Sequence, residues 1–209
     1  MSARPLDVLA HEVRSPVAAL AAIAAAYPSA DVSRRPRLLE LAHAAVIAIE
    51  RLLVDAAPGS LRRERVDIGR IVRAAAETAE LAGARVVADV GEELVVDGDP
   101  WRLRQAFDNL IGNAFGHSPP GAPVTVTGRR DGTLVVISVR DEGDGLAAAD
   151  LARVFDAGVR LTDARPGQGL GLAVVRAIAR AHGGEVEADS APGRGATFRL
   201  VLPGASEPD

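Results

Sequence analysis

Two N-terminal segments place apolar residues at every third or fourth position, which is the spacing of one face of an α-helix. The first segment, residues 6–26, ends at Tyr27-Pro28, and the second, residues 34–56, ends at Pro58-Gly59. The apolar positions are Leu9, Val13, Val17 and Leu20 in the first segment and Leu38, Leu41, Ala45, Ile49 and Leu52 in the second. A hairpin of two such helices has too small a core to be stable alone, so we expect it to dimerise into a four-helix bundle.

The rest of the chain alternates between helical and strand patterns. Helices are predicted at 68–81, with Asp67 as N-cap, and at 100–116 and 170–182; strands are predicted at 85–90, 93–96, 124–129, 134–140, 185–189 and 197–202. This order predicts an α+β fold, an α/β sandwich in which helices stack on one mixed sheet. We therefore expect a hairpin domain at 1–56, a linker at 57–65 and a second domain at 66–209.

Composition removes several classes of chemistry. The 209 residues include no cysteine, and all 24 basic residues are arginine, which excludes disulfides, thiol catalysis, lysine Schiff bases and the P-loop lysine. A net charge of −4 without a concentrated basic face argues against nucleic acid as a partner. The longest apolar run, residues 17–27, is about half of what a bilayer-spanning helix needs, and it lacks the flanks of a signal peptide. We expect a cytoplasmic protein with no membrane contact from this chain.

A histidine with a neighbouring carboxylate stands in the first predicted helix, in the string His11-Glu12-Val13-Arg14-Ser15-Pro16. On a helix, His11 points about 200° away from Leu9 and so lies outside the apolar stripe. An exposed neutral imidazole can act as a nucleophile, with Glu12 taking or orienting the ring proton. The alternative is an ordinary surface histidine. A zinc protease is excluded, because His-Glu-x-x-His would need a histidine at Ser15.

Three further features favour a nucleotide site without a P-loop. Asn109 and Asn113 share one face of a predicted helix, where amide oxygens can bind Mg²⁺ beside phosphates. The segment Asp141-Glu142-Gly143-Asp144-Gly145 follows a strand, where an aspartate can accept a hydrogen bond from an adenine amino group and glycines let the backbone approach the base. The segment Gly167-Gln168-Gly169-Leu170-Gly171-Leu172 opens a helix, whose free N–H groups favour phosphate. Each feature alone has an ordinary explanation as caps, an acidic turn or a helix start, but their order and spacing are specific.

These motifs, in this order, resemble the sequence boxes of the histidine kinase family. Residues 11–16 resemble its H box, 104–114 its N box, 141–145 its G1 box, Val154-Phe155-Asp156 the start of its F box, 167–172 its G2 box, and Gly195-Ala196-Thr197-Phe198 with Leu202-Pro203 its closing strand. The resemblance covers nearly the whole chain. It implies a dimerisation and histidine phosphotransfer hairpin followed by an ATP-binding domain of the kind shared with Hsp90, gyrase B and MutL.

For the hairpin, the resemblance implies a homodimer and a phosphotransfer role. His11 would be the phosphoacceptor, and Glu12 would be its acid/base partner. The phosphoryl group would then pass to an aspartate on the receiver domain of a response regulator. Ser15, one turn after His11, would contribute to dephosphorylating that partner.

For the second domain, the resemblance implies ATP and Mg²⁺ as ligands. Asn113 would coordinate Mg²⁺, Asn109 would lie near the phosphates, and Asp141 would bind the adenine amino group. The pocket and the phosphate end of a lid at 158–167 would be formed by Gly143, Gly145, Gly167, Gly169, Leu170 and Gly171.

The sequence departs from the family pattern near the phosphates and the base. Gly116 stands where lysine or arginine is usual, a contact that Arg160 would supply in part, and His117 stands where an aromatic ring often lies against adenine. The F box has Ala157-Gly158-Val159 in place of a proline and a second aromatic. These departures leave open a phosphotransfer adaptor that does not bind ATP. A further alternative is a superfamily ATPase or serine kinase such as an anti-sigma factor, although those lack the hairpin. His182 is interpreted as a helix-terminal residue whose substitution changes little.

Overall fold

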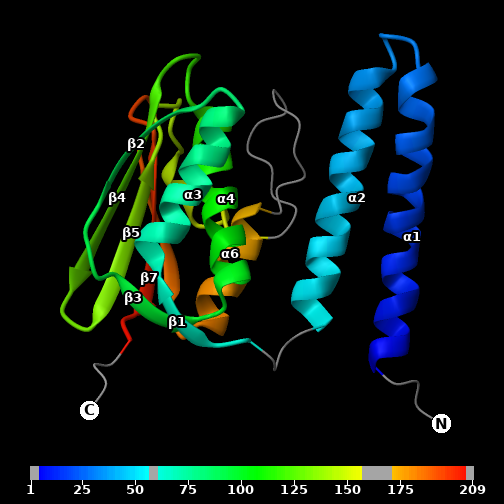
Figure 1. Ribbon diagram of the computed structural model, residues 1–209. Coiled ribbons are helices and arrows are strands. Elements are labelled where there is room, and N and C mark those ends of the chain that lie inside the picture. Colours follow the sequence, from blue (N-terminus) through cyan, green and yellow to red (C-terminus); the bar gives the residue numbers. More distant parts are fainter. Residues whose placement is uncertain (1–4, 57–60, 157–170, 206–209) are drawn as a thin grey trace.

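The N-terminal segments form a pair of antiparallel helices that lie side by side (Figure 1). The structure is a computed structural model that describes residues 5–56, 61–156 and 171–205. Helix α1 (Pro5–Ala26), the 3-10 turn η1 (Tyr27–Ser29) and helix α2 (Arg35–Ala56) confirm both predicted helices to within one residue at each end. The Arg35 guanidinium lies 5.5 Å from the centre of the Tyr27 ring, a cation–π contact between the two ends of the turn. Within the described ranges, no helix is both long and apolar enough to cross a bilayer.

The second part of the chain is a sheet covered by helices on one face (Figure 1). Its elements are β1 (Glu64–Asp67), α3 (Ile68–Leu81), β2 (Arg85–Val90), β3 (Val95–Gly98), α4 (Pro100–His117), β4 (Pro123–Asp131), β5 (Leu134–Arg140), α5 (Ala148–Leu151), α6 (Gly171–Ala181), β6 (Glu185–Ser190) and β7 (Ala196–Pro203). In the described part of the chain the main sheet has the strand order β2-β4-β5-β7-β6, with β2 parallel to β4 and the other neighbours antiparallel. Helices α3, α4 and α6 lie against it, which confirms the predicted α+β class and the mixed sheet.

The core lies between the sheet and the helices, because apolar residues alternate along the central strands. The fully or almost fully buried positions are Val135, Ile137 and Val139 in β5 and Phe198, Leu200 and Leu202 in β7. Helix residues that pack against them include Val72, Phe107, Leu110, Val175 and Ile178. Burial of each side chain of this size contributes about 1.5–3 kcal/mol. The same burial fixes α4, the helix that carries the two asparagines of the predicted site.

A second, two-stranded sheet departs from the prediction of one sheet. The segment predicted as a strand at 93–96 becomes β3 two residues later, because Glu93 has a φ of 60°, which lies outside the β region. Strand β3 pairs antiparallel with β1 rather than joining the main sheet. Of the four described residues of β1, Val66 is the buried one, so this short strand has no alternating pattern, and it overlaps the segment predicted as linker. The chain also returns to β3 near its end, where Ala205 N donates to Val95 O at 2.8 Å.

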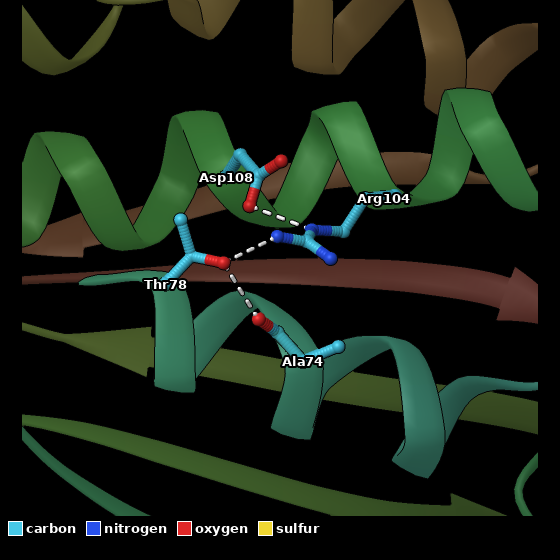
Figure 2. Close-up of polar contacts among 4 residues, drawn as sticks. All are labelled: Ala74, Thr78, Arg104 and Asp108. Atoms are coloured by element: carbon cyan, nitrogen blue, oxygen red, sulfur yellow. Dashed lines mark hydrogen bonds and ion pairs between the residues drawn. The ribbon is translucent and has the colours of Figure 1, made fainter. Parts of the chain in front are cut away.

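Helices α3 and α4 are joined by a small polar network (Figure 2). Arg104 on α4 donates from Nε to Asp108 Oδ1 at 2.8 Å and from Nη2 to Thr78 Oγ1 at 2.7 Å, and the Thr78 hydroxyl donates to Ala74 O at 3.0 Å. Helix α3 begins as predicted, with Asp67 Oδ1 accepting from Arg70 N at 3.2 Å. The arginine therefore links α3 to α4.

His182, at the end of α6, forms hydrogen bonds that connect this helix to the residue before α4, a role that the sequence did not predict. The residue is buried, and its Nε2 accepts from Asp99 N at 3.0 Å while its Nδ1 lies 2.8 Å from Ile178 O. Burial lowers the pKa of His182, and the hydrogen bond to Ile178 opposes this effect. The Asp99 carboxylate caps α4 through Trp101 N and also accepts from Arg62 N at 3.2 Å. The interpretation as a simple helix-terminal residue is therefore incomplete.

Candidate functional site

One face of α4 carries the asparagines of the predicted nucleotide site. Asn109 and Asn113 are half-buried and lie one turn apart, away from the fully buried face formed by residues such as Phe107 and Leu110. Asn109 Nδ2 donates to Gly171 O at 3.5 Å, at the first described residue of α6. Asparagine is a poor helix former, so these positions are held by the packing of the apolar face. Asn109 thereby lies beside the start of the helix predicted to bind phosphate.

Asp141 is a buried carboxylate at the end of β5, with 3% of its surface exposed. Its Oδ1 accepts backbone hydrogen bonds from Gly143 N at 2.9 Å and Ala196 N at 3.0 Å, and its own N–H donates to Ala196 O at 2.9 Å. Among the described residues no donor reaches Oδ2, and no fully buried side-chain oxygen lacks a partner. The carboxylate is therefore held by one oxygen, and the other oxygen has no hydrogen-bond partner among the described residues.

Two glycines after Asp141 allow close backbone contacts. A Cβ on Gly143 would overlap the backbone carbonyl oxygen of His117 at the end of α4. Gly145 has a φ of 70°, and a Cβ there would overlap the carbonyl oxygen of Ala191. The loop after β5 thus lies directly against the end of α4 on one side and against the loop between β6 and β7 on the other. No other residue type allows both contacts.

The described part of the predicted F box packs onto the core. Val154 is buried, and the Phe155 ring meets Phe198 of β7 edge-on, with ring centroids 6.1 Å apart and an interplanar angle of 85°. Asp156 Oδ1 forms an ion pair with Arg176 Nη2 at 3.2 Å. The chain is therefore anchored to β7 and α6 immediately before residue 157.

The described residues of the predicted site fall into two groups linked by α4. The base group comprises Asp141, Gly143 and Gly145 together with the backbone of His117, whose side chain is exposed. The phosphate group comprises Asn109 and Gly171, with Asn113 one turn further along the same helix. Outside the described residues lie Arg160, Gly167, Gly169, Leu170 and the predicted lid at 158–167. His11 and Glu12 belong to α1, but their side chains are likewise outside what is described; Ser15 is exposed on that helix.

Several residues at the base group were not predicted as site residues. Ala196 supplies a backbone donor to Asp141, Ser118 Oγ accepts from Glu142 N at 3.4 Å, and Ser190 bonds to the loop after β5. The partners of the first of these contacts are 55 residues apart in the chain. The glycine-rich segment before Ala196 was the available signal, since close backbone approach is a common reason for glycine.

A comparison with protein families assigns the α/β part of the chain. Residues 98–206 match the family described as "Histidine kinase-, DNA gyrase B-, and HSP90-like ATPase". The chain belongs to this family. The matched region contains α4, Asp141, both glycines and α6, so the family match coincides with the geometry described above.

Relatives narrow the assignment within this ATPase family. The chain is 36% identical over 217 residues to the sensor-like histidine kinase SenX3 of Mycobacterium tuberculosis, covering 95% of this chain and 53% of SenX3. It is 30% identical over 218 residues to the sensor histidine kinase WalK of Bacillus subtilis, covering 93% of this chain and 35% of WalK. The crystal structure of full-length ShkA in complex with AMPPNP superposes with a TM-score of 0.74 at 30% identity, covering 97% of this chain and 46% of ShkA. This member of the ATPase family has the ATP-binding core of a sensor histidine kinase. The chain spans about half the length of SenX3 and less than half the length of WalK and of ShkA.

Proposed function

We propose that this chain is the catalytic core of a two-component histidine kinase, which transfers the γ-phosphoryl group of ATP to His11 and then to an aspartate of a response regulator. The observation that carries the proposal is Asp141, a buried carboxylate with one oxygen fixed by two backbone donors and the other without a partner among the described residues. The helical hairpin that precedes the ATPase domain, with His11 on α1, supports a histidine kinase over an ATPase of the same family without a hairpin.

The site fits an adenine nucleotide. Oδ2 of Asp141 is an acceptor without a partner among the described residues, and the amino group of adenine is a donor of matching kind. The base would lie beside the end of α4, near His117. The phosphates would extend along α4 toward Asn109 and the N-terminus of α6, where backbone N–H groups and the helix dipole favour negative charge.

Mg²⁺ fits this site only together with the nucleotide. Among the described residues there is no cluster of three or more His, Asp or Glu side chains that could hold a metal. Asn113 offers one half-buried amide oxygen on the same face as Asn109. Mg²⁺ is commonly bound by few protein ligands plus substrate phosphates. When bound, it would neutralise charge on the β- and γ-phosphates.

The phosphotransfer would proceed in two steps. A neutral ring nitrogen of His11 attacks the γ-phosphorus, the bond from that phosphorus to the bridging oxygen breaks, and ADP leaves. The displaced ring proton passes to Glu12. The phosphorus–nitrogen bond then breaks as a carboxylate oxygen of the response regulator attacks, and the phosphoryl group moves to that partner.

A homodimer through α1 and α2 is part of the proposal. Several apolar side chains of this hairpin are more than a third exposed in the single chain: Val17 at 47%, Leu39 at 56%, Leu41 at 43% and Val46 at 41%. Burying such side chains against a second copy would recover free energy that a lone hairpin lacks. Sedimentation of the full chain should give a dimer, and a monomer at micromolar concentration would contradict this part.

Labelling with radioactive ATP and Mg²⁺ tests the reaction. We expect an acid-labile, base-stable label that His11→Gln abolishes while ATP binding persists. Asp141→Asn should weaken ATP binding, because the amide keeps Oδ1 for the two backbone donors but places a donor toward the adenine amino group. Asn113→Ala should reduce both binding and labelling.

The other outcomes separate the alternatives. ATP binding with no label on His11 at any Mg²⁺ concentration would favour an ATPase of the superfamily. No ATP binding at all would favour the phosphotransfer adaptor. That result would point to the missing cationic side chain at Gly116 as a cause. A Cβ added at Gly116 would meet no atom within 4 Å, so there is room for such a side chain.

A further inference from the structure

Two loops beside Asp141 are joined to each other by hydrogen bonds. The first is the loop 141–146 after β5, and the second is the loop 190–196 between β6 and β7; together they are called the loop clasp below. Gly195 N donates to Gly143 O at 3.0 Å, and Gly193 N donates to Asp144 O at 2.6 Å. With the reciprocal bonds between Asp141 and Ala196, these contacts join the loops along their length.

Ser190 contributes its side chain to this loop clasp. Its Oγ accepts from Leu146 N at 2.8 Å and donates to Gly195 O at 2.6 Å. Both distances are those of good hydrogen bonds, and the residue is half-buried. Within the two loops, which are fully described, Asp141 is the other residue whose side chain bonds across the clasp; the remaining bonds join backbone groups. The two hydrogen bonds of Ser190 can therefore be removed from the loop clasp by substituting this one side chain.

We propose that Ser190 is a positioning residue for recognition of the adenine base, an inference that rests on the proposed ATP function. Its hydroxyl fixes Gly195, and the next residue, Ala196, is a backbone donor to Asp141 Oδ1. Without the hydroxyl, the half-buried Leu146 N–H and the buried Gly195 C=O lose their partners, and the loops separate to admit water. Ala196 N then moves, and the carboxylate turns away from the orientation in which Oδ2 meets the amino group.

The proposal predicts a loss specific to the amino group rather than to the nucleotide in general. ATP is compared with purine riboside triphosphate, which has the same phosphates and ring system but lacks that amino group. In the full chain, Ser190→Ala should weaken ATP binding by about tenfold, the size of effect expected when the one bond from Ala196 N to Asp141 is misaligned. Binding of the analogue should be nearly unchanged. Ser190→Thr, which keeps the hydroxyl, should restore the preference for ATP.

Two controls make the result specific. Ser138→Ala removes a half-buried hydroxyl from β5 that has no hydrogen-bond partner among the described residues, and it should leave both affinities unchanged. In the Asp141→Asn background, Ser190→Ala should add no further loss of ATP affinity, because the residue acts through that carboxylate. If Ser190→Ala does not fold by circular dichroism, Ser190→Cys replaces it and should give a smaller but still amino-selective loss.

The failures are distinguishable. Equal weakening of ATP and the analogue by Ser190→Ala, or full additivity with Asp141→Asn, would overturn the role of Ser190 and leave the kinase proposal intact. If Asp141→Asn itself leaves ATP binding unchanged, base recognition by Asp141 is wrong, and the proposed function loses its main support.

Discussion

Gly145→Ala should be among the most damaging single-methyl changes in the protein. The φ of 70° puts the new residue in the left-handed region, which costs an L-residue about 1–2 kcal/mol. The added Cβ also overlaps the carbonyl oxygen of Ala191 and comes 3.1 Å from Gly195 O. Backbone atoms cannot rotate away as a side chain can, and such overpacking costs about 1–3 kcal/mol. The total is about 2–5 kcal/mol from one methyl group, by the same two estimates.

A matched glycine separates the two contributions. Gly121 has a φ of 81°, and a Cβ there meets nothing within 4 Å, so Gly121→Ala should cost only the backbone part, about 1–2 kcal/mol. Urea unfolding of both variants gives the free energies of unfolding, and calorimetric titration gives the ATP affinities. Gly145→Ala should lose more stability and most ATP binding, whereas Gly121→Ala should bind ATP normally. Equal losses of stability, or normal ATP binding by Gly145→Ala, would refute the claim that this contact shapes the site.

Other substitutions test other parts of the molecule. Thr78→Val keeps the shape of the side chain but removes its bonds to Arg104 and Ala74, so urea unfolding should show a loss of about 0.5–1 kcal/mol. Because burial lowers the pKa of His182, the unfolded chain takes up a proton below about pH 6.5 that the folded chain resists. Stability measured in urea should therefore fall from pH 7.5 to pH 5.5, and His182→Gln should flatten that fall. Asp141→Asn should improve binding of inosine triphosphate relative to ATP in a competition assay, because an amide donor meets the oxygen that replaces the amino group. Ser15→Ala should slow dephosphorylation of a cognate regulator, and an unchanged rate would remove that role.

The helices were predictable because their ends carry strong local signals. Tyr27-Pro28 stops α1, Asp67 caps α3, and the periodic apolar residues of α4 leave one polar face. Asp141 could be proposed as a site residue for the same reason, since an acidic residue followed by glycines at a strand end is a local pattern. In each case, the residues that decide the structure are neighbours in the sequence.

The contacts that escaped prediction depend on residues far apart in the chain. Ser190 and Leu146 are 44 residues apart, and His182 and Asp99 are 83 apart. Nothing local marks Ser190 as different from any other strand-end serine. Strand β1 has the opposite difficulty: it is too short and polar to show an alternation, and its pairing with β3 defines it. A single sequence therefore predicts the elements and residues that a local pattern marks, and it does not predict contacts between residues far apart in the chain.

Strand β3 contacts both the first and the last described segments of the α/β part of the chain. It pairs with β1 as the chain enters, and it meets Gly204 and Ala205 as the chain leaves. The first and the last described segments of this part are thus held together by the same strand. The first described contacts that follow the hairpin are the Arg62–Asp99 bond, the Arg63–Ala181 bond and the pairing of β1 with β3. A substitution that removes one of these contacts would therefore act where the α/β part begins, and it would leave the two backbone donors to Asp141 in place.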